Sequence, residues 1–266
     1  MLKDLSVAVL QTTVPTNSTD GEAQVERLVK EATSFNVDMV GLPEDCITPR
    51  LEISTGYAAL NFLSAIAKKY STYLFGATGV LENDGIHDRG FLFNREGKLI
   101  LAHDKIVLTP PEVEQGVVAG ATLNITDTEF GRIAILVCKD TFHRYAPWFF
   151  NELRKSAVDI VLVPSYSLNV SKRSIELWVD SLKAQAKWFD LYIVAPGTIG
   201  KNLTAFPSFG HSLIICPNRV VLAEGSTDKE EILTAKLDVE SLETVRKTVG
   251  ALWQPETVPA FTVILH

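Results

Sequence analysis

Short apolar segments of strand length alternate with amphipathic helical segments along most of this chain, and this alternation limits the folds that it can adopt. The segments that predict buried strands are Ser6–Gln11, Val37–Leu42, Tyr73–Leu81, Ile133–Val137, Ile160–Pro164 and Tyr192–Ala195. The segments that predict helices are Asp20–Phe35, with Asp20 as its N-cap, Tyr57–Tyr70, Pro147–Ser156 and Lys172–Phe189. Such alternation is typical of α/β proteins, in which helices cover the faces of a sheet.

Other segments predict antiparallel pairs, so we expect the sheets to be mixed. Turn signals separate Arg89–Asn94 from Lys98–His103, and His211–Cys216 from Arg219–Glu224. The remaining expected elements are a Pro- and Gly-rich loop at Thr109–Gly120, a strand at Glu231–Leu237 and a short helix at Val239–Lys247 that Asp238 caps. No long polar linker divides the chain. We therefore expect one domain over residues 1–266, with an irregular tail at 250–266.

The composition argues against several classes of protein. The net charge is −7 and no basic cluster occurs, so a nucleic-acid partner is not expected. No apolar run reaches the roughly 20 residues of a membrane span, and residues 1–9 lack the features of a signal peptide. Cys46, Cys138 and Cys216 are widely spaced and form no CxxC pair, which suggests neither a disulfide framework nor a thiolate zinc site. This cysteine usage fits a reducing, cytoplasmic location best.

Three chemically useful side chains follow predicted strands. Glu44 and Cys138 each come directly after a buried strand, and Lys105 follows the second strand of the first hairpin. Because strand ends in an open α/β sheet converge where ligands bind, we expect these side chains to lie together. In such a site a glutamate can take a proton from the thiol, and a lysine can lower the pKa of that thiol and stabilise an oxyanion. The backbone N–H of Lys139 is a second candidate donor to the oxyanion.

The segments around these residues resemble the nitrilase superfamily of carbon–nitrogen hydrolases, whose active site is a Glu-Lys-Cys triad. The matching pieces are, in order, Val7–Gln11, Leu42-Pro43-Glu44, Asp104-Lys105, Phe130–Asp140 and Phe209–Ser212. The resemblance covers roughly Val7 to Arg246, and the stretch that ends in Cys-x-Asp is its most specific part. It implies a four-layer α-β-β-α sandwich, no metal or organic cofactor, and pairing through the outer helices into a homodimer or higher homo-oligomer.

The resemblance also implies a role for each residue of the triad. Glu44 would be the general base, Lys105 the electrostatic partner and Cys138 the nucleophile. Members of the superfamily often carry a second glutamate shortly after the lysine. Glu112, which follows a Leu-Thr-Pro-Pro run, is the favoured candidate, and Glu114 is the alternative.

The residues after the nucleophile indicate the type of reaction. Cys138-Lys139-Asp140 resembles the amidase-type and carbamoyl-amide members, whereas true nitrile hydrolysers tend to carry Cys-Trp-Glu. This predicts hydrolysis of a small linear carboxamide or N-carbamoyl compound through a thioester. Asp140 itself is expected to bond to the backbone of the turn. Lys139, His143 and Tyr166 are candidate substrate-binding residues, and the departures from the family pattern at Thr141–Tyr145 and Gln185 leave the substrate open.

Three other interpretations remain. Nitrile hydrolysis is one of them. A Cys-His hydrolase is the second, with His103, His143 or His211 as the base, although no nucleophile-elbow motif surrounds the cysteine. The third is a non-catalytic binding protein with the same fold, although such a protein has no need of a glutamate and a lysine at strand ends.

Overall fold

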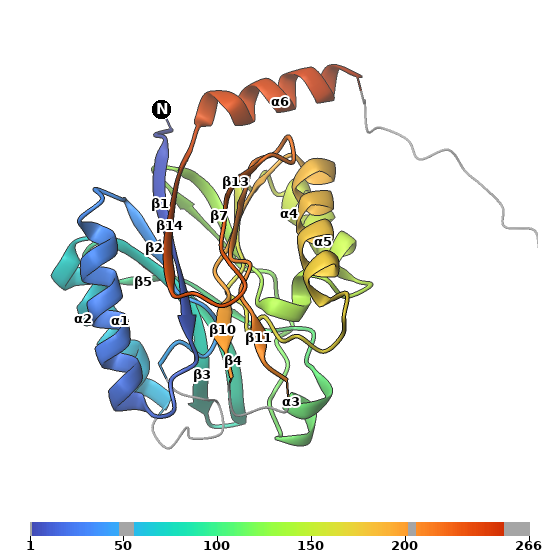
Figure 1. Ribbon diagram of the computed structural model, residues 1–266. Coiled ribbons are helices and arrows are strands. Elements are labelled where there is room, and N and C mark those ends of the chain that lie inside the picture. Colours follow the sequence, from blue (N-terminus) through green and yellow to red (C-terminus); the bar gives the residue numbers. More distant parts are fainter. Residues whose placement is uncertain (1, 48–55, 202–205, 253–266) are drawn as a thin grey trace, which may run out of the picture.

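Two mixed β-sheets pack face to face, and helices cover the outer face of each sheet (Figure 1). The structure is a computed structural model that describes residues 2–47, 56–201 and 206–252. One apolar cluster lies between the sheets, and one further cluster lies under the helices on each side. The order of layers is therefore helix, sheet, sheet and helix, which confirms the predicted four-layer sandwich.

The first sheet has eight strands within the described residues, in the order β11-β10-β1-β2-β3-β4-β5, with β14 beside β1. The bounds are β1 Leu5–Thr13, β2 Met39–Gly41, β3 Tyr73–Glu82, β4 Gly85–Phe93, β5 Leu99–Asp104, β10 Thr198–Gly200, β11 Ser208–Phe209 and β14 Glu231–Leu237. Strands β1, β2 and β3 are parallel, whereas β3, β4 and β5 form an antiparallel meander. Helices α1 (Ser18–Thr33) and α2 (Gly56–Tyr70) cover the outer face of this sheet.

The second sheet has six strands in the part of the chain that the structure describes, in the order β13-β12-β9-β8-β7-β6. The bounds are β6 Ile125–Thr128, β7 Gly131–Ile135, β8 Ile160–Leu162, β9 Tyr192–Ala195, β12 Leu213–Ile215 and β13 Val221–Glu224. Strands β7, β8 and β9 are parallel, and helices α4 (Ala146–Lys155) and α5 (Ser174–Phe189) cover them. Helix α6 (Val239–Leu252) follows β14 and lies across one end of the sandwich (Figure 1).

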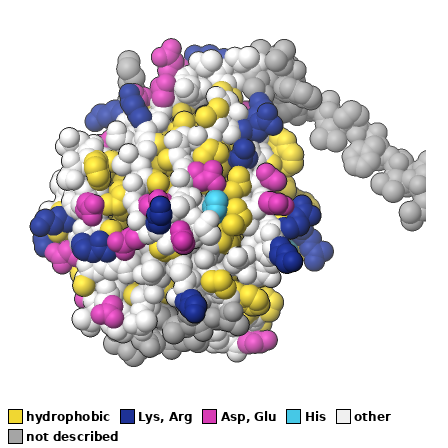
Figure 2. Space-filling view, in the orientation of Figure 1, with side chains coloured by type: hydrophobic (Ala, Val, Ile, Leu, Met, Phe, Trp, Pro, Cys, Tyr) yellow, Lys and Arg dark blue, Asp and Glu magenta, His cyan; other side chains and the backbone are white. Residues whose placement is uncertain are grey.

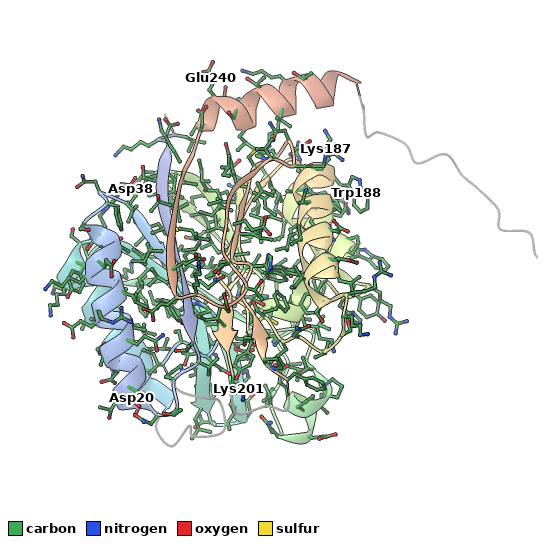
Figure 3. All side chains as sticks on the ribbon, in the orientation of Figure 1. Asp20, Asp38, Lys187, Trp188, Lys201 and Glu240 are labelled. Carbon is green, nitrogen blue, oxygen red and sulfur yellow. The ribbon has the colours of Figure 1, made fainter. Side chains whose placement is uncertain are left out.

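Strand β7 is buried on both faces, which explains its unbroken run of apolar residues. Ile133 and Ile135 pack between the sheets, whereas Ala134 packs under the outer helices. Side chains fill the space between the two sheets (Figure 3). Gly90 on β4 allows the sheets to approach closely here, because a Cβ at this position would lie 2.5 Å from Cγ2 of Ile135. The end of β7, which leads to Cys138, is therefore held against the first sheet.

Three local predictions were wrong. The N-cap of α1 is Asn17 rather than Asp20, because Oδ1 of Asn17 accepts a hydrogen bond from the backbone N of Asp20 at 3.0 Å. The segment Thr109–Gly120 contains a short helix, α3 (Pro110–Glu114), where a loop was expected. A proline suits the first turn of a helix, since its missing N–H would have no helical partner there. Strands β10 and β11 were not predicted, because Thr198-Ile199-Gly200 and Ser208-Phe209 mix polar and apolar residues and neither is part of an apolar run.

Helix α6 is longer than predicted. It continues from Val239 to Leu252, so residues 250–252 are helical, and the rest of the expected tail, 253–266, lies outside the described residues. Oδ1 of Asp238 accepts a hydrogen bond from the backbone N of Glu240 at 2.9 Å, which confirms Asp238 as the cap. The described residues thus end within a regular helix.

The surface carries charges of both signs. On the face shown in Figure 2, Lys and Arg side chains are interspersed with Asp and Glu instead of gathering in one patch. Among the described helices, none combines the length and apolar character that crossing a bilayer requires. The cytoplasmic location stays a prediction.

Candidate active site

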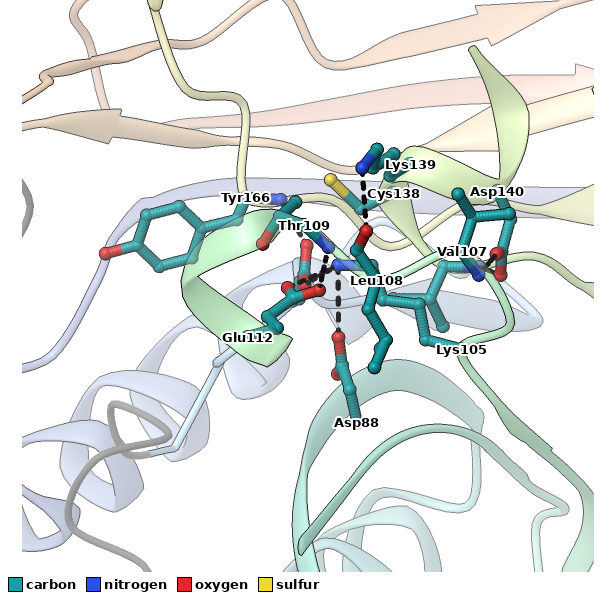
Figure 4. A network of polar contacts seen from close by, with 12 residues as sticks. Asp88, Lys105, Val107, Leu108, Thr109, Glu112, Cys138, Lys139, Asp140 and Tyr166 are labelled. Atoms are coloured by element: carbon teal, nitrogen blue, oxygen red, sulfur yellow. Dashed lines mark hydrogen bonds and ion pairs between the residues drawn. The ribbon is translucent and has the colours of Figure 1, made fainter. Parts of the chain in front are cut away.

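A buried lysine is the centre of a polar network between the sheets (Figure 4). Lys105 follows β5, and its side chain is 1% exposed. Its Nζ lies 2.9 Å from Oε1 of Glu44, 2.7 Å from Oε1 of Glu112 and 3.3 Å from Oδ2 of Asp88. Lysines are almost never fully buried unless they are paired. The three carboxylates therefore compensate the burial of this ammonium group.

Backbone amides fix the two glutamates of this network. The turn after β2 carries Glu44, whose Oε2 accepts a hydrogen bond from the backbone N of Tyr166 at 2.8 Å. Oε2 of Glu112 accepts one from the backbone N of Thr109 at 2.7 Å, so this side chain caps α3 and holds Lys105 at once. Glu114 lies on the same short helix but is exposed. The geometry thus favours Glu112 over Glu114 as the second glutamate.

Cys138 begins a 3-10 helix, Cys138–Thr141, which is separated from β7 by Leu136 and Val137. Its φ of 45° is in the left-handed region, which is unfavourable for residues with a side chain and is concentrated at functional sites. Its backbone N donates to the carbonyl O of Pro164 at 3.0 Å, in the loop that follows β8. The strained turn is therefore anchored to the loop after β8, and Cys138 is buried, with 9% of the residue exposed.

On balance, the surroundings of Cys138 favour its thiol form. Burial raises the pKa of Cys138 well above its ordinary value, and the negative charge of Glu44 adds to this effect. Lys105, the hydroxyl of Ser165 and the backbone of Tyr166 act in the opposite direction, because each favours the thiolate. Glu44 and Lys105 thus act on the pKa of the thiol in opposite directions. The cysteine therefore needs a base to become a nucleophile.

Asp140 joins the cysteine turn to the lysine loop. Oδ1 of this buried carboxylate accepts hydrogen bonds from the backbone N of Ile106 at 3.1 Å and of Val107 at 2.8 Å. Its Oδ2 accepts one from the backbone N of Val137 at 3.1 Å and lies 3.1 Å from Nε2 of His103. The predicted backbone role of Asp140 is confirmed. It also fixes the position of the chain after Lys105 relative to the chain around Cys138.

The predicted substrate-binding residues lie in different places. Nζ of Lys139 donates to the carbonyl O of Leu108 at 2.7 Å, and its amide belongs to the first helical turn, where N–H groups lack helical acceptors. Tyr166 contacts Glu44 through its backbone, and its ring extends away from Cys138 in the view of Figure 4. His143 instead lines a surface hollow of about 360 Å³ beside α4 and α5. A substrate contact of His143 stays a prediction.

Two residues of this site were not identified from the sequence. Asp88 lies within β4, and Ser165 lies in the loop after β8, where small polar residues are common. The only signal for Asp88 is the run His87-Asp88-Arg89 in an otherwise apolar hairpin. Both side chains are buried, at 0% and 1% exposure. A buried carboxylate inside a strand indicates a specific electrostatic role.

The carboxylates of Glu44, Asp88 and Glu112 have oxygens within 4.8 Å of one another, a spacing that also suits a metal ion. Here the ammonium of Lys105 contacts all three side chains. The three carboxylates therefore already surround a cation, the ammonium group of Lys105.

Comparisons with known proteins point to one family. The model of the carbon–nitrogen hydrolase family matches residues 6–247. The chain is similar to the omega-amidase NIT3 of Saccharomyces cerevisiae, with 25% identity over 227 residues that cover 81% of this chain and 74% of that protein. It is also similar to a deaminated glutathione amidase of Yersinia enterocolitica, with 23% identity and coverage of 94% and 93%.

Solved structures share the fold. The crystal structure of Saccharomyces cerevisiae Nit3, described as a member of the nitrilase superfamily, superposes with a TM-score of 0.84 at 22% identity and covers 96% of this chain and 97% of that one. An amidase from Nesterenkonia sp. AN1, in complex with acrylamide, superposes with a TM-score of 0.79 at 17% identity, with coverage of 94% and 97%. The arrangement of sheets and helices is therefore common to all three proteins.

Proposed function

Because this chain belongs to the carbon–nitrogen hydrolase family of the nitrilase superfamily, we propose that it is an amidase with Cys138 as its nucleophile. The substrates are small linear carboxamides or N-carbamoyl compounds. One observation carries the proposal: the buried ammonium of Lys105 contacts both Glu44 and Glu112, and the charges of Glu44 and Lys105 act on the Cys138 thiol. The amidase names of the relatives support the choice of an amide over other carbon–nitrogen bonds.

The reaction runs through a thioester. Glu44 takes the proton of the Cys138 thiol as the sulfur attacks the carbonyl carbon of the amide. The ammonium of Lys105 and the backbone N–H of Lys139 stabilise the oxyanion, and Glu44 then returns the proton to the leaving ammonia or amine. In the second half, Glu44 takes a proton from water, which attacks the thioester and releases the acid and the thiol. Glu112 holds Lys105 throughout.

The histidine alternative receives no support from the contacts. Nε2 of His103 lies against Asp140, and Nδ1 of His211 lies 2.7 Å from Oε1 of Glu224. The principal groups that shift the pKa of Cys138 are Glu44, Lys105, Ser165 and Tyr166, and none of these described residues is a histidine. A glutamate base therefore fits the site better than a histidine base.

The choice of substrate gives a direct test. Small amides, ω-amides of dicarboxylates and N-carbamoyl amino acids are offered beside the matching nitriles, and ammonia release is measured. We expect amide or carbamoyl turnover to exceed nitrile turnover by at least about tenfold, which corresponds to roughly 1.4 kcal/mol in the barrier. The Cys-x-Asp sequence and the amidase relatives are the basis of this expectation. Faster release from the nitriles would overturn the assignment.

We further infer that copies of the chain pair through the outer face of α4 and α5. Trp148 and Trp188 on these helices are 68% and 67% exposed, and Trp188 lies on the outer side of α5 (Figure 3). In the adjacent hollow, Oε1 of Gln185 and Nδ1 of His143 are buried and have no hydrogen-bond partner among the described residues. A second copy would cover the apolar rings and supply partners to these atoms.

Replacing Trp188 with glutamate is expected to convert the assembly into monomers, because it places a charge in the centre of the buried face. Light scattering at micromolar concentration measures the mass. The control is Phe35→Glu, since Phe35 is also an exposed ring, at 57%, but lies next to the end of α1 in the opposite helix layer. A wild-type protein that is already monomeric would contradict the inference.

A further inference from the structure

Three carboxylates in this site share one ammonium group. Glu44, Asp88 and Glu112 are 1%, 0% and 7% exposed, and each contacts Lys105. If all four groups are ionised, the cluster has two more negative charges than positive charges. Like charges at this separation repel strongly when water is excluded, so an excess of this size is unusual in a protein interior. It calls for a functional explanation.

Glu44 is subject to two conflicting demands. A single lysine in contact with a carboxylate stabilises its anion and makes it a weak base. The base in this site must nevertheless deprotonate Cys138, whose thiol is itself held protonated by burial. Two further carboxylates beside the same ammonium offset part of its positive charge. They thereby leave Glu44 a stronger base, while Lys105 keeps its contact with it.

Asp88 and Glu112 hold Lys105 in different ways. Glu112 also caps α3 through Thr109, so its position is tied to the helix as well as to the lysine. Asp88 projects from the middle of β4, and its own carbonyl O accepts a hydrogen bond from the backbone N of Lys105 at 2.9 Å. The same residue therefore holds both the backbone and the ammonium of Lys105.

We propose that Asp88 is a charge-setting and positioning residue of the active site, whose negative charge on Lys105 keeps Glu44 basic enough to activate Cys138. The charged and titratable groups of the site around Asp88 and Lys105 come from four elements. They are Glu44 from the turn after β2, Lys105 and His103 from β5 and its end, Glu112 from α3, and Cys138 and Asp140 from the turn after β7. The inference rests on the proposed function for the meaning of this charge, but the charge itself is measurable without a substrate.

The test removes the charge and keeps the shape. In Asp88→Asn, the loss of a nearby negative charge lowers the pKa of both Glu44 and Cys138, because the protonated forms lose their electrostatic advantage. Both limbs of the pH profile of kcat/KM should therefore move to lower pH, by about 0.5 to 1 unit. The maximum of kcat/KM should fall about tenfold, since the base is weaker. A purely structural role would lower activity without moving either limb.

The control variant is Asp84→Asn. Asp84 lies in the turn just before β4, its side chain is 65% exposed, and it pairs with His87 instead of Lys105. Solvent screens its charge, so the pH limbs should stay where they are in the wild type. Circular dichroism checks that the Asp88 variant is folded. If it is not, Asp88→Ser removes the same charge with a smaller side chain and should give the same shift.

A second readout needs no amide. Modification of Cys138 by methyl methanethiosulfonate is followed against pH by mass spectrometry of its peptide. We expect the midpoint to shift to lower pH in Asp88→Asn and to stay fixed in Asp84→Asn. If the wild type hydrolyses no amide but the midpoint still shifts, the proposed function fails and the role of Asp88 stands. Unchanged midpoints and unchanged pH limbs in Asp88→Asn would show that Asp88 carries no charge in the native site, and would overturn the inference.

Discussion

Replacing Cys138 with serine is expected to lower amide hydrolysis by at least about a thousandfold, the loss seen when a catalytic nucleophile is removed. The substitution keeps the size of the side chain, so the strained turn and the bond to Pro164 should persist. A serine hydroxyl is far less nucleophilic than a thiolate and a poorer match for a carboxylate base. The loss should therefore appear in kcat, with little change in KM.

The matched control is Cys216→Ser. Cys216 is also buried, at 6% exposure, but its thiol donates to Oδ1 of Asn218, a bond that a serine hydroxyl can replace. Ammonia release, with a urea unfolding curve for each variant, separates loss of chemistry from loss of structure. Turnover above one tenth of the wild-type value in Cys138→Ser, with a normal unfolding curve, would remove the cysteine from the mechanism.

The position of the nucleophile could be predicted because β7 is buried on both faces. Such a strand is an unbroken apolar run, so its end is visible in the sequence, and Cys138 follows the apolar run that continues through Leu136 and Val137. The strands Tyr192–Ala195 and Glu231–Leu237 also have the predicted bounds. Their ends could be predicted because turn residues lie on either side of them. Glu44 and Lys105 could also be predicted, since both follow strands of the first sheet.

Asp88 could not be predicted in the same way. It lies within an antiparallel strand, and nothing in its neighbours tells which strand face meets the second sheet. The contact of Asp88 with Lys105 can be inferred only when the register of β4 and β5 is known. Long-range pairing of this kind depends on the tertiary packing, for which a single sequence contains no local signal.

Glu112 could be distinguished from Glu114 only in part from the sequence. Thr109-Pro110-Pro111-Glu112 has the spacing of a capping box, so a helix start at this point could have been predicted. A capping box at this point would have predicted that the side chain of Glu112 accepts a hydrogen bond at the N-terminus of α3. The contact of its other oxygen with Lys105 still depends on where α3 packs, which only the structure gives.

Lys105→Met should have the largest effect on stability of any single change in this site. Methionine has a similar length but no charge, so three buried carboxylates with oxygens within 4.8 Å of one another lose their shared cation. Removing one partner of a buried ion pair costs roughly 3–5 kcal/mol of the free energy of unfolding. Amide hydrolysis should be lost as well, because the oxyanion loses its charged donor.

The pH dependence of this loss identifies its cause. Without the ammonium, mutual repulsion and burial raise the pKa of the carboxyl groups in the folded state above their unfolded values. The folded variant then binds more protons than the unfolded chain, so its stability rises as the pH falls. The difference from the wild type in urea unfolding should therefore be largest near neutral pH and should shrink toward about pH 5.

The control for this prediction is Lys69→Met. Lys69 pairs with Glu26 on the surface, where its side chain is 57% exposed, so solvent already screens the pair and the unfolding curve should hardly change at either pH. A Lys105→Met protein as stable as the wild type at neutral pH would mean that the three carboxyl groups are neutral in the native state. In that case the ammonium of Lys105 would not hold Glu44 as an anion, and Glu44 could not act as the base for Cys138.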